Sequence, residues 1–223
     1  MKASALAAIT AGFSLLASIP TLHAQEQIVH PVLITNESGF EILDLFLSPA
    51  DRPSRSANLI APNETLRDGE ARRYGVHLPG ECDDYDLLAV DADGDAYEIS
   101  GIAICRGEES SIAITLDHIV GPAAERRLRP IRLINRLPFD LHYVFLTPSS
   151  AATWGVDYLT PSRVLERGRS LSLLVPESAS QEAMELLLVD EKASRYAIAL
   201  EIEEGERPTE VFVELTDLKE VGR

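Results

Sequence analysis

The sequence predicts an all-β protein made of two tandem small β-sandwich domains, of the immunoglobulin-like or the C2-like kind. Three observations lead to this prediction. The chain of 223 residues matches itself at a constant offset of 99 residues. Each copy consists of short apolar or alternating runs separated by turn residues. Long stretches with the spacing of an amphipathic helix are hard to find.

The internal repeat fixes the expected domain organisation. Asn36 matches Asn135 and Gly69 matches Gly168 in the same register. A period of this length is too long for a solenoid unit and suits an independently folding domain. The predicted organisation is a signal peptide at 1–24, a first sandwich at 25–120, a linker at 121–129 and a second sandwich at 130–223.

The expected strands follow from the apolar runs. Ile112, Ile114 and Leu116 alternate with small or polar residues, which is the pattern of a half-buried strand. The segment at 181–189 could be read as a helix, but its equivalent in the first copy is clearly strand-like, so we expect a strand there too. In the first copy the expected strands are residues 31–36, 40–48, 72–77, 85–91, 96–104 and 110–116.

The first residues have the pattern of a signal peptide. Lys2 precedes an uncharged apolar run at 3–19, Pro20 ends this run, and Ala24 offers a small residue for cleavage. The alternative is a membrane anchor, which needs about 20 apolar residues. We therefore expect a periplasmic or secreted protein, without stable membrane insertion, whose mature chain begins at Gln25.

The chain is acidic, with a formal net charge of −16. Between residues 25 and 120 there are 6 basic and 19 acidic residues, so most of the negative charge lies in the first copy. Such a surface repels the phosphates of nucleic acids and anionic lipids, so neither is an expected partner. The charge serves solubility in the simplest interpretation, and attracts a cation or a basic partner in the alternative one.

A hairpin is expected to bring Cys82 and Cys105 together. A two-residue type I′ turn at Asp93 and Gly94 would set a register in which these two cysteines are opposite each other. Export favours oxidation, so a disulfide is predicted. This register places the pair at a hydrogen-bonded position, where the side chains are farther apart, unless a bulge near Gly101 changes the parity.

The same hairpin carries many carboxylates. Its turn resembles the start of a calcium-binding loop, although the residues after the turn do not fit the helix–loop–helix template. Calcium is therefore the only cofactor considered, and the alternative is an ordinary turn whose aspartates cap their own backbone. The candidate calcium ligands are Asp83, Asp84, Asp91, Asp93 and Asp95.

No catalytic signature occurs in the sequence: zinc-type histidine spacing, a nucleophile elbow and a phosphate loop are all missing. A hydrolase would have to gather His77 or His142 with a Ser and an Asp in space. A candidate binding loop contains Trp154, the sole tryptophan, and Asp157, because loops on a rigid scaffold often carry recognition. In the alternative interpretation Trp154 folds back against the edge of its domain.

The repeated motifs point to a family. They comprise an early Asn, a Ser/Thr-Pro, a Leu-x-x-Gly, the Trp-Gly-x-Asp at 154–157 of the second copy and the acidic Asp-x-Asp-Gly-Asp turn at 91–95 of the first. In these motifs both copies resemble a tandem β-rich repeat of uncharacterised secreted bacterial proteins. The resemblance implies a β-rich fold and export, and it implies no activity.

These observations predict an exported, non-enzymatic binding or interaction protein. The expected partner is a protein or a component of the cell envelope. Two alternatives stay open: a calcium-binding β-sandwich module, and a periplasmic hydrolase without a recognisable motif.

Overall fold

The computed structural model confirms the all-β class. Within the described residues the regular elements are strands, apart from short 3-10 segments such as η1 (Leu116–His118). The structure describes residues 28–50, 56–107, 109–124, 127–151, 153–161, 163–177, 183–200, 202, 208–216 and 219–220. The predicted signal peptide at 1–24 lies outside these residues.

The strands of the first repeat are β1 (His30–Glu37), β2 (Ile42–Pro49), β3 (Ala71–His77), β4 (Cys82–Asp91), β5 (Asp95–Cys105), β6 (Ser110–Thr115) and β7 (Ile119–Pro122). Those of the second repeat are β8 (Leu128–Asn135), β9 (Leu141–Pro148), β10 (Gly155–Asp157), β11 (Ser170–Pro176), β12 (Met184–Asp190), β13 (Arg195–Leu200), β14 (Thr209–Val213) and β15 (Lys219–Glu220). The segment at 181–189 is thus a strand from Met184 onward, as predicted.

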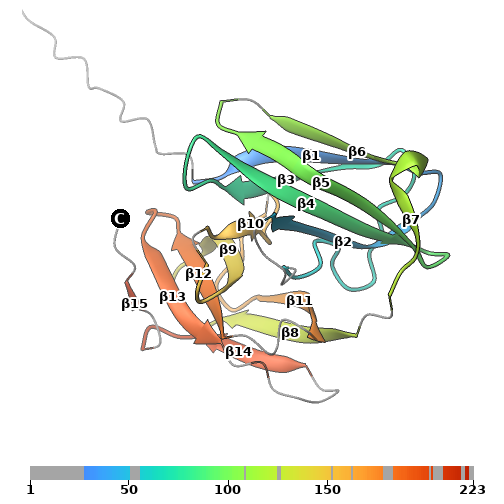
Figure 1. Ribbon diagram of the computed structural model, residues 1–223. Coiled ribbons are helices and arrows are strands. Elements are labelled where there is room, and N and C mark those ends of the chain that lie inside the picture. Colours follow the sequence, from blue (N-terminus) through green and yellow to red (C-terminus); the bar gives the residue numbers. More distant parts are fainter. Residues whose placement is uncertain are drawn as a thin grey trace, which may run out of the picture.

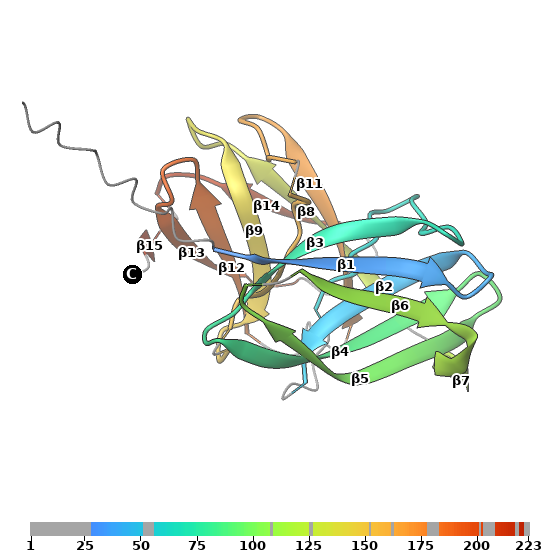
Figure 2. The same cartoon turned by 90° about the horizontal axis from the view of Figure 1, so that it is seen from above.

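Each repeat contains two sheets that pack on an apolar core. In the first repeat the sheets are β10-β3-β1-β6 and β2-β4-β5-β7, around residues such as Ile34 and Leu47. In the second they are β11-β8-β14 and β15-β13-β12-β9, around residues such as Leu133 and Leu146. Figures 1 and 2 show the two halves side by side. Both repeats place their first strand between an antiparallel and a parallel neighbour.

The region between the repeats is shorter than the predicted linker at 121–129. Pro122 still belongs to β7, because it pairs with Asp95 in β5. Leu128 already belongs to β8, because it pairs with Pro176 in β11. The last strand of the first repeat therefore ends at residue 122 and the first strand of the second begins at residue 128.

The two repeats also exchange a short segment with each other. β10 of the second repeat is the edge strand of the first repeat's sheet, where Asp157 is opposite Gly75 in β3 (Figure 1). In return, the backbone N–H of Asn58 donates to the carbonyl oxygen of Leu174 in β11 at 2.7 Å. These two contacts are related by the offset of 99 residues, so the chain resembles a dimer with a twofold interface fused into one polypeptide.

Side chains follow the same exchange. Val156 in β10 is buried in the apolar core of the first repeat. Ala57, which lies one repeat earlier, is buried in the core of the second. Each sandwich therefore needs one residue of the other to complete its core.

Other repeated motifs hold turns within each repeat. The side-chain amide of Asn36 donates to the carbonyl oxygens of Phe40 and Leu66, at 2.7 and 2.8 Å. The N–H of Gly69 donates to the carbonyl oxygen of Asn36 at 2.7 Å, and Gly69 has a φ of +74°, which favours glycine. Asn135 makes the equivalent contacts in the second repeat. The early Asn and the Leu-x-x-Gly are thus structural.

Candidate functional site

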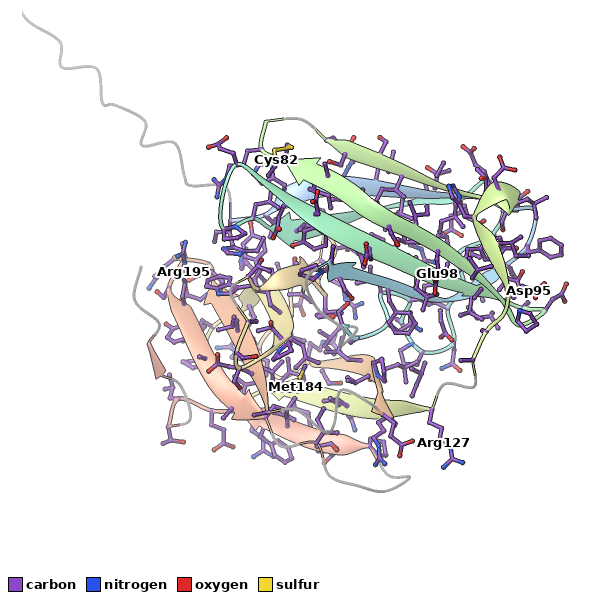
Figure 3. All side chains as sticks on the ribbon, in the orientation of Figure 1. Cys82, Asp95, Glu98, Arg127, Met184 and Arg195 are labelled. Atoms are coloured by element: carbon purple, nitrogen blue, oxygen red, sulfur yellow. A yellow bond between two sulfur atoms is a disulfide. The ribbon has the colours of Figure 1, made fainter. Side chains whose placement is uncertain are left out.

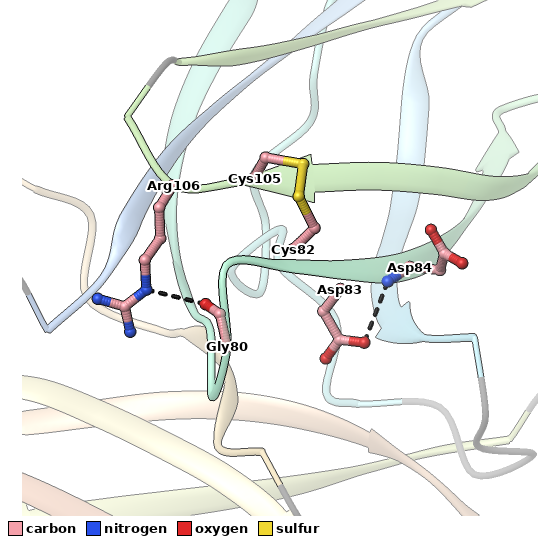
Figure 4. The surroundings of a disulfide bond; sticks show 6 residues. All are labelled: Gly80, Cys82, Asp83, Asp84, Cys105 and Arg106. Atoms are coloured by element: carbon pink, nitrogen blue, oxygen red, sulfur yellow. Dashed lines mark hydrogen bonds between the residues drawn. A yellow bond between two sulfur atoms is a disulfide. The ribbon is translucent and has the colours of Figure 1, made fainter.

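The predicted disulfide is present at the open end of the β4–β5 hairpin. Cys82 is opposite Cys105 in the register, and their sulfur atoms are 2.07 Å apart (Figure 4). Next to it, the guanidinium of Arg106 donates to the carbonyl oxygen of Gly80 at 2.8 Å. The second repeat has no cysteine at these positions, so the disulfide is particular to the first.

The turn that closes this hairpin differs from the predicted two-residue type I′ turn. Only Gly94 has a positive φ, at +87°, and Asp91 is opposite Asp95 across a three-residue loop. This shifts the register by one residue. A bulge that places Ser100 and Gly101 opposite Asp86 shifts it back, with the Gly101 N–H donating to Asp86 Oδ1 at 2.9 Å. The cysteines meet because these two irregularities compensate.

Asp91, a candidate calcium ligand, holds the turn. Its Oδ1 accepts the backbone N–H groups of Asp93 and Asp95 at 3.0 and 2.9 Å, and its Oδ2 accepts the hydroxyl of Tyr97 at 2.8 Å. Asp190 makes the same three hydrogen bonds in the second repeat, whose turn lacks the acidic residues. The geometry is therefore that of an aspartate capping its own turn.

The five candidate calcium ligands do not come together. Asp83 and Asp84 lie beside the disulfide, whereas Asp95 lies at the other end of the hairpin (Figures 3 and 4). Eight residues separate Asp83 from Asp91 along one strand, which corresponds to roughly 26 Å. Among the described residues, no three His, Cys, Asp or Glu side chains are grouped as metal ligands would be. Calcium binding remains the alternative hypothesis for this hairpin.

Trp154 packs against the first repeat. Its ring stacks on the imidazole of His77, with centroids 4.5 Å apart, and lies 5.3 Å from the ring of Phe145. The Thr153 hydroxyl donates to the carbonyl oxygen of His77 at 2.8 Å, and the Arg195 guanidinium lies 5.2 Å from the Trp154 ring. This half-buried tryptophan thus joins the two repeats, and its role in binding a partner stays a prediction.

A cavity of about 250 Å³ opens beside this contact, between the two repeats; we call it the junction cavity. The first repeat contributes the side of β3 that carries Arg73 and Gly75, and the second contributes β9 and the loop after β10. Its lining residues are Val29, Pro31, Arg73, Tyr74, Gly75, His142, Tyr143, Asp157, Pro161, Arg163 and Val164. The cavity combines an apolar wall with several polar groups, which is typical of small-molecule sites.

Asp157 is the buried polar group of this cavity. Its Oδ1 accepts the backbone N–H groups of Val144 at 2.9 Å and Leu159 at 3.0 Å. Burial raises the pKa of Asp157 to about 8, although these two hydrogen bonds act in the opposite direction. The carboxyl is therefore mostly protonated at neutral pH. Burial and the charge of Asp157 also raise the pKa of Tyr143.

Two arginine side chains line the cavity. Arg73 forms an ion pair with Glu109, which does not line the cavity. Among the described residues, the guanidinium of the exposed Arg163 has no ion pair. The lining thus carries positive charge within an acidic protein.

A smaller cavity of about 60 Å³ lies next to the first and shares Asp157 and Arg163 with it. Its lining comes in pairs related by 99 residues, such as Leu59 with Tyr158 and Tyr74 with Leu173. The buried hydroxyl of Tyr74 has no hydrogen-bond partner among the described residues, and burial raises its pKa to about 12. This cavity therefore lies where the two repeats face each other symmetrically.

Sequence reasoning named Asp157 and His142, but it did not place them together and it missed their other neighbours in the cavity. A signal for them was present in the differences between the copies. Arg73, His142 and Arg163 correspond to residues 172, 43 and 64, which are Ser, Leu and Glu. Position 174, equivalent to Gly75, is Leu. Such differences indicate a site only once the fold shows that these positions meet.

The sequence matches no protein-family model and no curated protein. Among solved structures, the tip fimbrial protein Mfa3 from Porphyromonas gingivalis, with a C-terminal truncation, is similar over 81% of this chain and 84% of that chain. The sequence identity is 8% and the TM-score is 0.23. A similarity of this size carries no argument about function.

The described part of the chain contains no helix with the length and apolar character required to cross a bilayer.

Proposed function

We propose that this protein is an exported binding protein that acts without catalysis and recognises a small ligand in the junction cavity. The observation that carries the proposal is the position of the cavity. It lies where the two repeats meet, and junctions between domains are preferred sites for ligand binding. Side chains of both repeats line it, so a bound ligand would contact both.

Export is supported by the disulfide and by the predicted signal peptide. Disulfides persist in the periplasm and outside the cell and are rare in the cytosol. Cys82 and Cys105 form such a bond. The protein or cell-envelope partner expected from the sequence remains a proposal, and the junction cavity is one place where such a partner's small-molecule group would enter.

The hydrolase alternative has one supporting observation and lacks a second. His142 and Asp157 line the same cavity. Among the described lining residues, none is a Ser, Thr or Cys that could act as nucleophile. Binding without catalysis is therefore the function that the described geometry supports better.

The test uses variants that block the cavity without entering a core. Val164 lines it and is 39% exposed, so Val164→Trp should fill its mouth. Val120 is 61% exposed and lies in β7, away from the cavity, so Val120→Trp is the matched control. Ligand-observed NMR with a library of small anionic, neutral and cationic molecules should detect binding to the wild type and the control only. Equal binding to all three proteins, or to none, would contradict the proposal.

A further inference from the structure

The two repeats provide an internal comparison for the chemistry of the junction cavity. Four residues that line the cavity differ in kind from the residues 99 positions away in the other repeat. His142 corresponds to Leu43, Tyr143 to Asp44, Arg163 to Glu64 and Arg73 to Ser172. The junction cavity thus carries two arginines, a histidine and a tyrosine where the equivalent positions carry a serine or apolar or acidic residues, whereas its Asp157 corresponds to the neutral Asn58. Because both halves share one fold, the backbone alone does not require these groups.

We propose that the ligand of the junction cavity is a small organic acid, whose carboxylate binds at Arg163 and Arg73 and whose apolar part lies against Val29, Pro31 and Val164. This inference rests on the function proposed above and names the ligand class. Guanidinium groups bind carboxylates through paired, charge-assisted hydrogen bonds. Arg73 already forms an ion pair with Glu109. We therefore expect Arg163 to contribute more than Arg73 to binding the carboxylate of the ligand.

The size of the cavity limits the ligand. Pockets for drug-sized molecules measure about 300–1,000 Å³, and this cavity measures about 250 Å³. A single aromatic or short aliphatic acid is therefore the appropriate size. Its apolar part would meet side chains from both repeats, since Val29 belongs to the first and Val164 to the second.

Asp157 supports an anionic ligand only while it is protonated. Its Oδ1 accepts two backbone N–H groups, which leaves Oδ2 to carry the proton. Among the described residues, Oδ2 has no hydrogen-bond partner, so this group can donate to a ligand. The charged and titratable groups around it are Arg73 of β3, His142 and Tyr143 of β9, Arg163, and Arg72, Glu64, Tyr74 and Tyr158 across the smaller cavity.

The test measures binding of benzoate, benzamide and benzylamine to the mature protein by isothermal titration calorimetry at pH 7. Benzoate should bind, and its neutral and cationic analogues should bind at least about tenfold more weakly, because they lack the charge that pairs with arginine. Arg163→Glu, which introduces the residue of the other half, should weaken benzoate binding by about tenfold or more. Arg167→Glu makes the same charge change four residues away and should have no effect.

A second variant separates the role of Asp157 from that of the fold. Asp157→Asn should bind benzoate at pH 7 and keep binding it at pH 9.5, because the amide stays neutral. The wild type should bind more weakly at pH 9.5, where Asp157 is ionised and repels the ligand.

The outcomes distinguish the two proposals. If benzamide binds as tightly as benzoate and Val164→Trp abolishes both, the cavity binds ligands but the inferred anion is wrong. If Arg163→Glu and Arg167→Glu bind benzoate equally, the inference is also overturned. If none of the three probes binds but members of the small-molecule library do, the inferred ligand class is wrong and the proposed function stands. If no library member binds either, the proposed function fails as well.

Discussion

Asn58 and Asp157 occupy equivalent positions in the two repeats and make the same pair of hydrogen bonds. Oδ1 of Asn58 accepts the N–H groups of Leu45 and Ile60 at 2.9 and 3.0 Å. Oδ1 of Asp157 accepts the N–H groups of the equivalent residues, Val144 and Leu159, at the same distances. The second polar atom differs: Asn58 Nδ2 donates to Asp44 Oδ1 at 2.6 Å. One repeat thus satisfies this position with an amide, and the other with a buried carboxyl.

This pair predicts how stability depends on pH. The pKa of Asp157 is about 8 in the folded protein and about 3.9 in an unfolded chain. Between these values the folded state binds more protons, so the stabilisation is complete below about pH 4 and is lost as the pH rises to about 8. The free energy of unfolding should therefore fall by at most about 1.4 kcal/mol per pH unit through this one group.

Asp157→Asn should remove this pH dependence of the free energy of unfolding, because Asn58 shows that an amide side chain fits at the equivalent position. Urea unfolding of both proteins at pH 5, 7 and 9 measures the difference, which should grow in favour of the variant as the pH rises. Asp117→Asn, at an exposed position, is the control and should follow the wild type. Parallel curves for wild type and Asp157→Asn would show that the carboxyl is already ionised in the folded protein.

The second prediction concerns the close contact of β3 with the N-terminal segment. A Cβ atom on Gly75 would lie 2.7 Å from Val29 Cγ2, which is shorter than side chains tolerate. Gly75→Ala should therefore reduce the free energy of unfolding by about 1–3 kcal/mol. A Cβ on Gly80 meets no atom closer than 4.0 Å, so Gly80→Ala is the control.

Val29→Ala should relieve the clash, so the double variant should be more stable than the sum of the two single effects indicates. Chemical denaturation of the four proteins gives this coupling. Strictly additive effects would mean that Val29 does not occupy the space next to Gly75.

The third prediction tests the exchange between repeats. Val156 belongs to β10 but is buried in the core of the first repeat. Val156→Ala should therefore lower the stability of the first repeat, by about 2 kcal/mol for a truncated core side chain. Amide hydrogen exchange should show the loss of protection in β1 and β6, and less in β8. Loss confined to β8 and β14 would contradict the exchange, and the exposed Val164→Ala should change neither repeat.

The fourth prediction concerns the acidic turn. Asp91→Ala leaves the buried Tyr97 hydroxyl and two N–H groups without their acceptor, which should cost about 1–3 kcal/mol. Asp93→Ala removes a side chain that makes no hydrogen bond to any described residue, and it should change the free energy of unfolding by less than about 0.5 kcal/mol. Thermal unfolding of both variants measures this contrast, and similar losses would show that Asp93 has a further role.

The same experiment with calcium and then excess chelator tests the cation hypothesis. The oxygens of Asp91 already accept three hydrogen bonds, so we expect no change in Tm with calcium. A rise that chelator reverses, and that Asp93→Ala with Asp95→Ala abolishes, would identify a calcium site formed by this turn.

Some features could be predicted because they depend on local pattern. Alternating apolar residues and turn residues predict strands, and the offset of 99 residues predicts that both halves share one fold. The pairing of Cys82 with Cys105 follows from a hairpin, since a hairpin's register depends on its turn and bulges. The predicted two-residue turn was wrong, because the side chain of Asp91 stabilises a three-residue loop that the Asp-Gly pair alone does not indicate.

The sequence by itself therefore determined the all-β class, the repeat and the cysteine hairpin, because each depends on spacing along the chain. Only the tertiary structure decided that β10 completes the sheet of the other repeat and that Arg73, Tyr143 and Asp157 line one cavity. Arg73 lies 70 positions before Tyr143 and 84 positions before Asp157. Pairing over such a distance depends on how two complete sandwiches pack against each other, and no local pattern of side chains encodes that packing.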